Sequence, residues 1–386
     1  MAIIILIALI FIYYKKYLGE SKKITAISVF FLIIYLVFMF LYWNFCYSVL
    51  GWKYGITGSD MLNYFERAEN LYYGWQVKNP YGDISNPQIY GYNLFIYYIY
   101  IAIFYPINIV SNLGIISLLL INVLLSIFSG YHFFKFIENE FTNKNICFLS
   151  LIVYYSNISI AFTASRILRD ILMLYLSALF LDICNREDNK IIKKLSLMMP
   201  VILMRLYTFI YFIPFSLYKR RRRLALIISF IIVIFLLLLT INGNKFMESI
   251  GIRLPQIDLS EGLVGIAKYI LSPDIIDSYK SLRFPSNYIE MGYLPIIYFI
   301  LSIWNAIFLP VSLFGLLINK NNRPLSLICL LIVLAYGLII SGAYLGANEP
   351  RHKLLIILPI TILIAKGLEA IYYYLFYKKI AMKKRI

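Results

Sequence analysis

Charged residues lie within or beside long apolar runs at four places. A charged side chain in a membrane is energetically costly, so each of these residues is a candidate functional residue. The first place is the polar stretch "GITGSDMLNYFERAENLYYG" (55–74), which contains Asp60, Tyr64, Glu66 and Arg67. A carboxylate such as Asp60 can act as a general base that takes a proton from an attacking sugar hydroxyl. A simpler interpretation is that Asp60 only caps the helix that follows it.

Arginines mark the second and third places. The stretch "SRILRD" (165–170) brings Arg166, Arg169 and Asp170 to the end of a predicted hairpin of apolar helices. A guanidinium binds a phosphate through two parallel hydrogen bonds, which suits a phosphate ligand. The alternative is an internal Arg–Asp ion pair that pins the hairpin. Arg205, in "MRLYTF", is expected deep in the membrane, either as part of a site or as a lone snorkelling side chain.

The fourth place is "ANEPRHKLLIILP" (347–359), where Glu349, Arg351, His352 and Lys353 open the last apolar run. The simpler interpretation is an ordinary helix start, with Pro350 near its first turn. Positive charge on the outer side of a membrane nevertheless opposes the usual orientation bias. We therefore expect these side chains to bind the phosphate or pyrophosphate of a lipid carrier, together with the arginines above, in one outer cavity.

The residues that usually bind metals are few. The chain has two histidines and four cysteines, and their spacing matches no metal motif. The cysteines lie in or beside apolar runs and are expected to be small packing residues. We expect no metal site and no cofactor; a divalent metal ion is an option that the sequence does not support.

The composition indicates a protein with many membrane spans. Of 386 residues, 61% are hydrophobic and 14% are charged, whereas about 25% are charged in soluble domains. The net charge of +17 could suggest nucleic-acid binding. The basic residues, however, form short clusters beside apolar runs, as membrane proteins arrange them, and not one continuous face. Nucleic acid is therefore excluded as a partner.

Apolar runs of about 20 residues predict membrane helices. The expected fold is all-α, a single integral membrane domain over 1–386 with about 10–13 membrane helices, some of them short, broken half-helices. Full spans are predicted at 2–14, 24–48, 115–135, 146–164, 168–184, 224–242, 292–318, 324–345 and 354–376.

The distribution of basic residues predicts the orientation, because cytoplasmic loops are rich in Lys and Arg. By this rule the clusters at 186–194, 219–223, 319–323 and 378–386 are cytoplasmic, and so is the C-terminus. The location is expected to be the cytoplasmic membrane of a prokaryote. Two long outer loops, 49–88 and 243–291, are expected to carry amphipathic surface helices at 61–73 and 258–273.

Each membrane span takes the chain from one side of the membrane to the other. Two regions do not fit this rule as single spans. Residues 195–218 lie between two predicted cytoplasmic clusters and contain Pro200, Arg205 and Pro214. We expect two half-helices that meet near Arg205 and return, an arrangement tolerated where the freed backbone lines a polar cavity. The region 88–110 is predicted to form a similar pair or to lie along the membrane.

The acidic first outer loop, followed by "NPQIYGYNLFIYY" (86–98) and "SRILRDILMLYLSALFL" (165–181), resembles membrane glycosyltransferases of the C superfamily (GT-C). The middle and the end, with a Pro-broken helix pair and a late "RHK" before Pro359, resemble oligosaccharide repeat-unit polymerases of the Wzy and EpsG type. The resemblance implies a polyprenyl-(di)phosphate-linked saccharide as donor, used on the non-cytoplasmic face, and other polysaccharide-assembly proteins as partners beside membrane lipid. It implies Asp60 as base and Arg166, Arg169, Arg205, Arg351 and Lys353 as phosphate binders.

The chain departs from the GT-C pattern by an extra short span before the acidic loop and by lacking a large soluble C-terminal domain. These departures favour a polymerase or a small saccharide transferase. A transporter or flippase of the same lipid-linked saccharide is the main alternative, which would favour inverted repeats and charges near the bilayer midplane. A third hypothesis is a non-catalytic assembly subunit.

Overall fold

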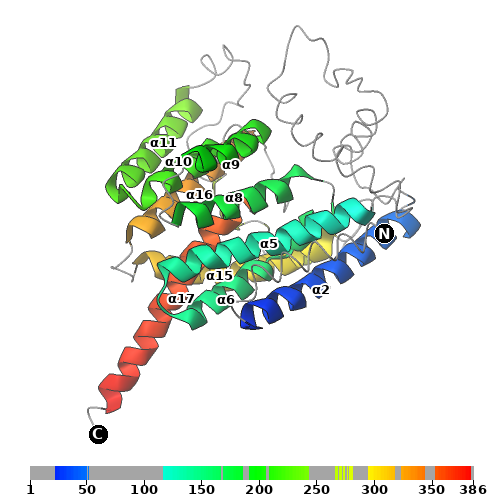
Figure 1. Cartoon of the computed structure of the whole chain (residues 1–386), viewed down its shortest axis with the longest axis horizontal. Helices are drawn as coiled ribbons and strands as arrows, with labels where there is room; N and C mark the ends of the chain where they lie inside the picture. Colours follow the sequence, from blue (N-terminus) through cyan, green and yellow to red (C-terminus); the bar gives the residue numbers. More distant parts are fainter. Residues whose placement is uncertain are drawn as a thin grey trace.

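The chain is described by a computed structural model over residues 22–49, 51, 116–166, 168–185, 191–205, 208–242, 294–317, 323–343, 353–383 and parts of 266–280. Every regular element in these residues is a helix (Figure 1). They are α2 (Lys22–Asn44) continued by a π-helical turn (Phe45–Val49), α5 (Ile116–Glu140), α6 (Lys144–Tyr155), α7 (Ile158–Ala164), α8 (Arg169–Asn185), α9 (Ile191–Met204), α10 (Phe209–Tyr218), α11 (Arg222–Asn242), α15 (Leu294–Leu317), α16 (Arg323–Ala343) and α17 (Leu354–Lys383).

Several of these helices are long and apolar enough to cross a membrane. Within the described residues, four helical segments of 22 to 28 residues meet that condition: Lys22–Val49, Leu118–Glu140, Pro295–Leu316 and Leu354–Leu375. A membrane helix needs about 20 residues to cross the hydrocarbon core. The prediction of an all-helical membrane protein is therefore confirmed at this level.

The first part of α17 lies at the centre of the bundle: 89% of the most apolar part of Leu354–Leu375 is buried, against 28% for Lys22–Val49. The C-terminal end of α17 extends away from the other helices (Figure 1). The neighbouring helix α15 approaches α17 closely at Gly315 and Gly367. A Cβ on Gly367 would overlap the carbonyl group of Val311, and a Cβ on Gly315 would lie 2.6 Å from the carbonyl oxygen of Leu363. The missing side chains let the two backbones pack together.

The remaining helices pack around this centre. The helix α5 packs on α8, α6 and α2, and α11 packs on α16 and α10. In Figure 1, α9, α10 and α11 lie on one side of α8, and α2 and α6 lie on the other side. The Tyr35 hydroxyl donates a hydrogen bond of 2.7 Å to the carbonyl oxygen of Tyr155, which fastens α2 to the end of α6.

The segment predicted as one span over 146–164 is bent into two helices, which together are long and apolar enough for one broken span or a re-entrant loop. The helices α6 and α7 meet at an angle of 50°. Asn157 starts α7, because its side chain accepts a hydrogen bond of 3.0 Å from the backbone N–H of Ser159. A side chain that caps a new helix in this way competes with continuation of the old one.

The prediction of two short helices over 195–218 agrees with the structure. The first, α9, ends at Met204, and the second, α10, begins at Phe209, so the break falls at Arg205. Pro200 and Pro214 lie inside α9 and α10 and do not form the break. The return of the chain between the two helices, which the sequence predicted, stays a prediction.

The second predicted outer loop also contains helical residues. The described residues between 266 and 271 are helical, and Ile266 and Tyr269 are buried. A Cβ on Gly337 would lie 3.1 Å from the Ile266 side chain, so this segment packs on α16. The predicted position of this segment on the outer membrane surface stays a prediction. The predicted span 2–14, the helix 61–73 and the region 88–110 lie outside the described residues.

Candidate functional site

A buried ion pair joins the second and third predicted places. Asp170 stands in the first turn of α8, where a carboxylate is favoured by the helix dipole. Arg205 stands at the break between α9 and α10. One guanidinium nitrogen of Arg205 lies 2.8 Å from a carboxylate oxygen of Asp170, and the two side chains are only 8% and 2% exposed. Arg205 is therefore not a lone snorkelling residue.

Arg169 strengthens the same junction. Its Nη1 donates a hydrogen bond of 2.8 Å to the carbonyl oxygen of Met204, the last residue of α9. The carbonyl groups at a helix end have no partner within the helix, so this contact satisfies one of them. The beginning of α8 is thus attached to the break between α9 and α10 through two adjacent side chains.

Arg166 lies in the short turn before α8. Its guanidinium carbon is 5.0 Å from the centre of the Phe162 ring, a cation–π contact. Its backbone oxygen accepts a hydrogen bond of 2.8 Å from the side-chain amide of Asn122 in α5. The turn is held by α5, and the Arg166 side chain is half-buried.

We call Arg169, Asp170 and Arg205 the arginine centre. It contains two guanidinium groups and one carboxylate, so one formal positive charge remains. Asp170 forms an ion pair with Arg205, a residue outside the predicted hairpin. A partly buried excess of guanidinium groups can bind an anion with charge-assisted hydrogen bonds.

Lys353 is placed by a different contact. It precedes α17, is 5% exposed, and donates a hydrogen bond of 3.1 Å to the carbonyl oxygen of Ile270. Burial lowers the pKa of Lys353 to about 7, because desolvation disfavours the charged ammonium.

The structure places five of the predicted site residues. Arg169, Asp170 and Arg205 lie together, Arg166 lies in the turn before α8 against Phe162, and Lys353 contacts Ile270. The remaining predicted residues lie outside the described residues: Asp60, Tyr64, Glu66, Arg67, Glu349, Arg351 and His352.

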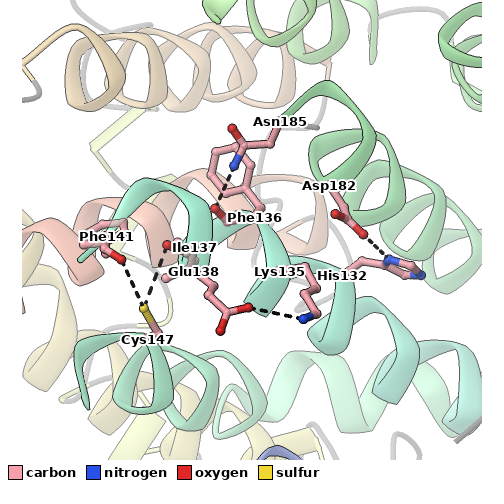
Figure 2. A network of polar contacts seen from close by, with 9 residues as sticks. All are labelled: His132, Lys135, Phe136, Ile137, Glu138, Phe141, Cys147, Asp182 and Asn185. Carbon is pink, nitrogen blue, oxygen red and sulfur yellow. Dashed lines mark hydrogen bonds and ion pairs between the residues drawn. The ribbon is translucent and has the colours of Figure 1, made fainter. Parts of the chain in front are cut away.

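The structure adds a pair that the sequence analysis did not consider. The Nδ1 atom of His132, on α5, lies 2.8 Å from a carboxylate oxygen of Asp182, on α8, and both side chains are buried (Figure 2). One turn further along α8, the Asn185 amide donates a hydrogen bond of 3.0 Å to the carbonyl oxygen of Phe136. These contacts hold the later halves of α5 and α8 together.

Two more ion pairs lie in the bundle. In α17, Lys366 lies 3.0 Å from Glu369 and 3.8 Å from the centre of the Phe141 ring. At the end of α5, the buried Glu140 carboxylate lies 2.8 Å from Lys219. Buried charged groups therefore occur in the described residues outside the four predicted places as well.

A signal for these groups was present in the sequence. His132 and Asp182 fall inside the predicted spans 115–135 and 168–184, and Lys366 and Glu369 fall inside 354–376. Titratable residues within spans deserve the same suspicion as those at span ends. No group of three His, Cys, Asp or Glu side chains that could hold a metal ion occurs in the part of the chain that the structure describes.

Comparisons of the chain with protein-family models, curated proteins and solved structures found no match. The function is therefore inferred from the residues of this chain.

Proposed function

We propose that the chain is a membrane glycosyltransferase that acts on a polyprenyl-(di)phosphate-linked saccharide, and that it extends or polymerises a surface polysaccharide. The observation that supports this proposal is the arginine centre, where Arg169, Asp170 and Arg205 meet at the junction of α8, α9 and α10. Excess positive charge in a partly buried place favours an anionic ligand, and a diphosphate supplies the matching charge.

The side chains of the centre and the neighbouring Arg166 have different roles in this proposal. Asp170 and Arg205 neutralise each other and fix the junction, so Arg205 is a positioning residue. Arg166 and Arg169 are only half-buried, and their guanidinium groups can reach a ligand phosphate. Asp60 is the base that takes the proton from the acceptor hydroxyl, and Arg351 and Lys353 are further phosphate contacts.

The proposed membrane arrangement follows the basic clusters. The turn at 219–223 and the C-terminus face the cytoplasm of a prokaryotic cell, and the loops 49–88 and 243–291 face outward. The helices α9 and α10 enter from the cytoplasmic side and return, with Arg205 at their deepest point. The Lys219–Glu140 contact supports this arrangement, because it puts the end of α5 and the α10–α11 turn at one level.

The test is a transfer reaction with the purified full-length chain in lipid nanodiscs. The substrate is lipid-linked oligosaccharide extracted from the source strain, and the product is separated by length on a gel. A ladder indicates polymerisation, and one added unit indicates single transfer. We expect the Asp60→Asn variant to give no product and the Asp83→Asn variant, with the same change in the same predicted loop, to be as active as the wild type.

Product from Asp60→Asn at the wild-type rate would exclude Asp60 as the base. Absence of any new glycosidic bond with the wild type, despite saturable binding of the lipid-linked saccharide, would exclude the transferase.

A transporter of the same lipid-linked saccharide is the second candidate. It is favoured by the His132–Asp182 and Lys366–Glu369 pairs, because buried titratable groups within membrane helices are typical of ion and proton pathways. The discriminating assay uses proteoliposomes with the saccharide lipid in both leaflets and a membrane-impermeant reagent that oxidises accessible sugars. A transporter makes the inner pool accessible over time, whereas a transferase leaves the two pools separate.

A further inference from the structure

A run of five exposed basic residues forms the turn between α10 and α11. These residues are Lys219, Arg220, Arg221, Arg222 and Arg223. The backbone N–H groups of Arg220 and Arg221 both donate to the carbonyl oxygen of Leu217, at 3.2 and 2.8 Å, so the turn is compact. Five positive charges are therefore concentrated in one short, ordered piece of backbone.

The turn is attached to the bundle through a buried carboxylate. Glu140, at the end of α5, lies 2.8 Å from the ammonium group of Lys219 and accepts a hydrogen bond of 3.0 Å from the hydroxyl group of Tyr218. The guanidinium group of Arg222 lies over the Tyr218 ring, 5.4 Å from its centre. Lys219 and Arg222 are thus used internally, and Arg220, Arg221 and Arg223 remain exposed towards the surroundings.

Helix stability does not explain these arginines. The first turn of α11 contains Arg222 and Arg223 and no acidic residue. Because the N-terminal end of a helix is partially positive, cations are unfavourable there and anions are favourable. An external anion would relieve this repulsion among the arginines and with the helix end.

The remaining residues of α11 indicate that this anion belongs to a membrane lipid. Its exposed apolar side chains follow a helical spacing along one face: Ile227, Phe230, Ile231, Ile234, Phe235 and Leu238. The helix has 21 residues, which at a rise of about 1.5 Å per residue corresponds to about 32 Å, close to the hydrocarbon thickness of a bilayer. If this face contacts acyl chains, the basic turn one helical turn earlier lies at the level of the phosphate groups.

We propose that Arg220, Arg221 and Arg223 form a binding site for an acidic phospholipid headgroup at the surface of the membrane in which α11 sits. The partner is a glycerophospholipid with a net negative charge, such as phosphatidylglycerol. Its phosphate lies among the three guanidinium groups, and its acyl chains lie along the apolar face of α11. This site is separate from the arginine centre and does not depend on the proposed activity.

The test measures lipid binding to the full-length chain in detergent by native mass spectrometry. Phosphatidylglycerol and phosphatidylcholine are titrated separately onto the wild type and the variant Arg220→Gln/Arg221→Gln/Arg223→Gln. Because basic residues attract acidic lipid headgroups, we expect the variant to bind phosphatidylglycerol roughly ten- to hundredfold more weakly. Binding of phosphatidylcholine should stay unchanged, and an unchanged circular dichroism spectrum shows that the variant is folded.

A matched control removes three charges that are not clustered. Lys22, Lys144 and Arg323 are exposed and stand at the beginnings of three different helices, α2, α6 and α16. We expect Lys22→Gln/Lys144→Gln/Arg323→Gln to retain phosphatidylglycerol binding within about threefold, since these charges are dispersed. A third variant with lysine at 220, 221 and 223 retains the charge and should also retain most of the binding.

Equal weakening by the clustered and the dispersed substitutions would overturn the proposal, because general attraction would then explain the binding. Displacement of phosphatidylglycerol by an equal concentration of inorganic pyrophosphate would also overturn it, since the site would then recognise a soluble anion.

Discussion

Asp170 and Arg205 form an ion pair of 2.8 Å between the first turn of α8 and the break between α9 and α10. The next residue on α8 towards the N-terminus, Arg169, holds the carbonyl group of Met204. Two side chains at the start of one helix therefore define how two short helices meet. The orientation of this junction sets which guanidinium groups can face a ligand.

Breaking the pair should destabilise the protein strongly. Removal of one partner of a buried ion pair costs about 3–5 kcal/mol, because the remaining charge stays buried without its counterion. We expect Asp170→Asn and Arg205→Gln each to lower the Tm measured in detergent by several degrees. The double variant should be less destabilised than the sum of the two single variants.

The control for this comparison is Asp188→Asn, the same chemical change in the polar segment that follows α8. Additive effects of the two single substitutions would mean that Asp170 and Arg205 do not stabilise each other.

Arg169 should affect both the junction and ligand binding. Arg169→Gln removes the positive charge and the hydrogen bond to Met204, and Arg169→Lys keeps only the charge. A charge-assisted hydrogen bond contributes about 1.5–3 kcal/mol, so we expect Arg169→Gln to weaken binding of farnesyl diphosphate by about tenfold or more. The measurement is a titration followed by intrinsic fluorescence.

Because lysine cannot bind a phosphate through a planar fork, Arg169→Lys should restore only part of that affinity. Arg186→Gln, in the segment after α8, serves as the charge control. Wild-type affinity in Arg169→Gln would remove Arg169 from the phosphate site.

The contact between α15 and α17 should tolerate no side chain at position 367. A Cβ on Gly367 would overlap the Val311 carbonyl group, which belongs to the backbone of a packed helix and cannot move alone. Overpacking of this kind typically costs about 1–3 kcal/mol. We expect Gly367→Ala to lower the Tm clearly, as measured by fluorescence-detected thermal unfolding.

Gly337→Ala provides the comparison. There the new Cβ would meet the Ile266 side chain at 3.1 Å, and a side chain can shift more easily than a backbone. A smaller loss of Tm at 337 than at 367 is expected, and the reverse order would contradict the helix contact described here.

Lys353 should make the stability depend on pH between about 7 and 10. Its pKa falls from 10.5 in the unfolded chain to about 7 in the folded chain, so in that window the unfolded chain binds the extra proton. Stability must then rise with pH, by at most about 1.4 kcal/mol per pH unit, and level off below the folded pKa. We expect the Tm of the wild type to rise more steeply between pH 7 and 10 than that of Lys353→Met.

The comparison uses slopes, because Lys353→Met also loses the hydrogen bond to Ile270 and changes the absolute Tm. Parallel Tm curves for the wild type and Lys353→Met would show that Lys353 is not the group responsible.

The sequence predicted most of the described helices, because long apolar runs leave a membrane helix as the main way to satisfy the backbone. It also predicted the break near Arg205, from the conflict between two basic clusters and one apolar region. It missed the break at Asn157, since an amide that caps a new helix inside an apolar run changes hydropathy very little. Hydropathy reports the length of a run but not local backbone hydrogen bonding.

The candidate site was predicted only in part. Residue type and position identified Arg169, Asp170 and Arg205, yet the pairing of Asp170 with Arg205 depends on how α8 packs beside the break. The His132–Asp182 pair was missed because its members lie in different predicted spans, and each looks like an isolated exception. Pairing between helices is a property of packing, which spacing along one chain does not reveal.

The two carboxylates of α8 also bear on how the chain is assembled during synthesis. Asp182 meets His132, which is already made when α8 leaves the ribosome, whereas Asp170 meets Arg205, which is made later. At about 5–20 residues per second, Arg205 follows Asp170 by roughly two to seven seconds. The helix α8 can therefore dock on α5 at once, but its first turn must wait for the α9–α10 junction. Insertion of that junction completes the charge pairing of α8.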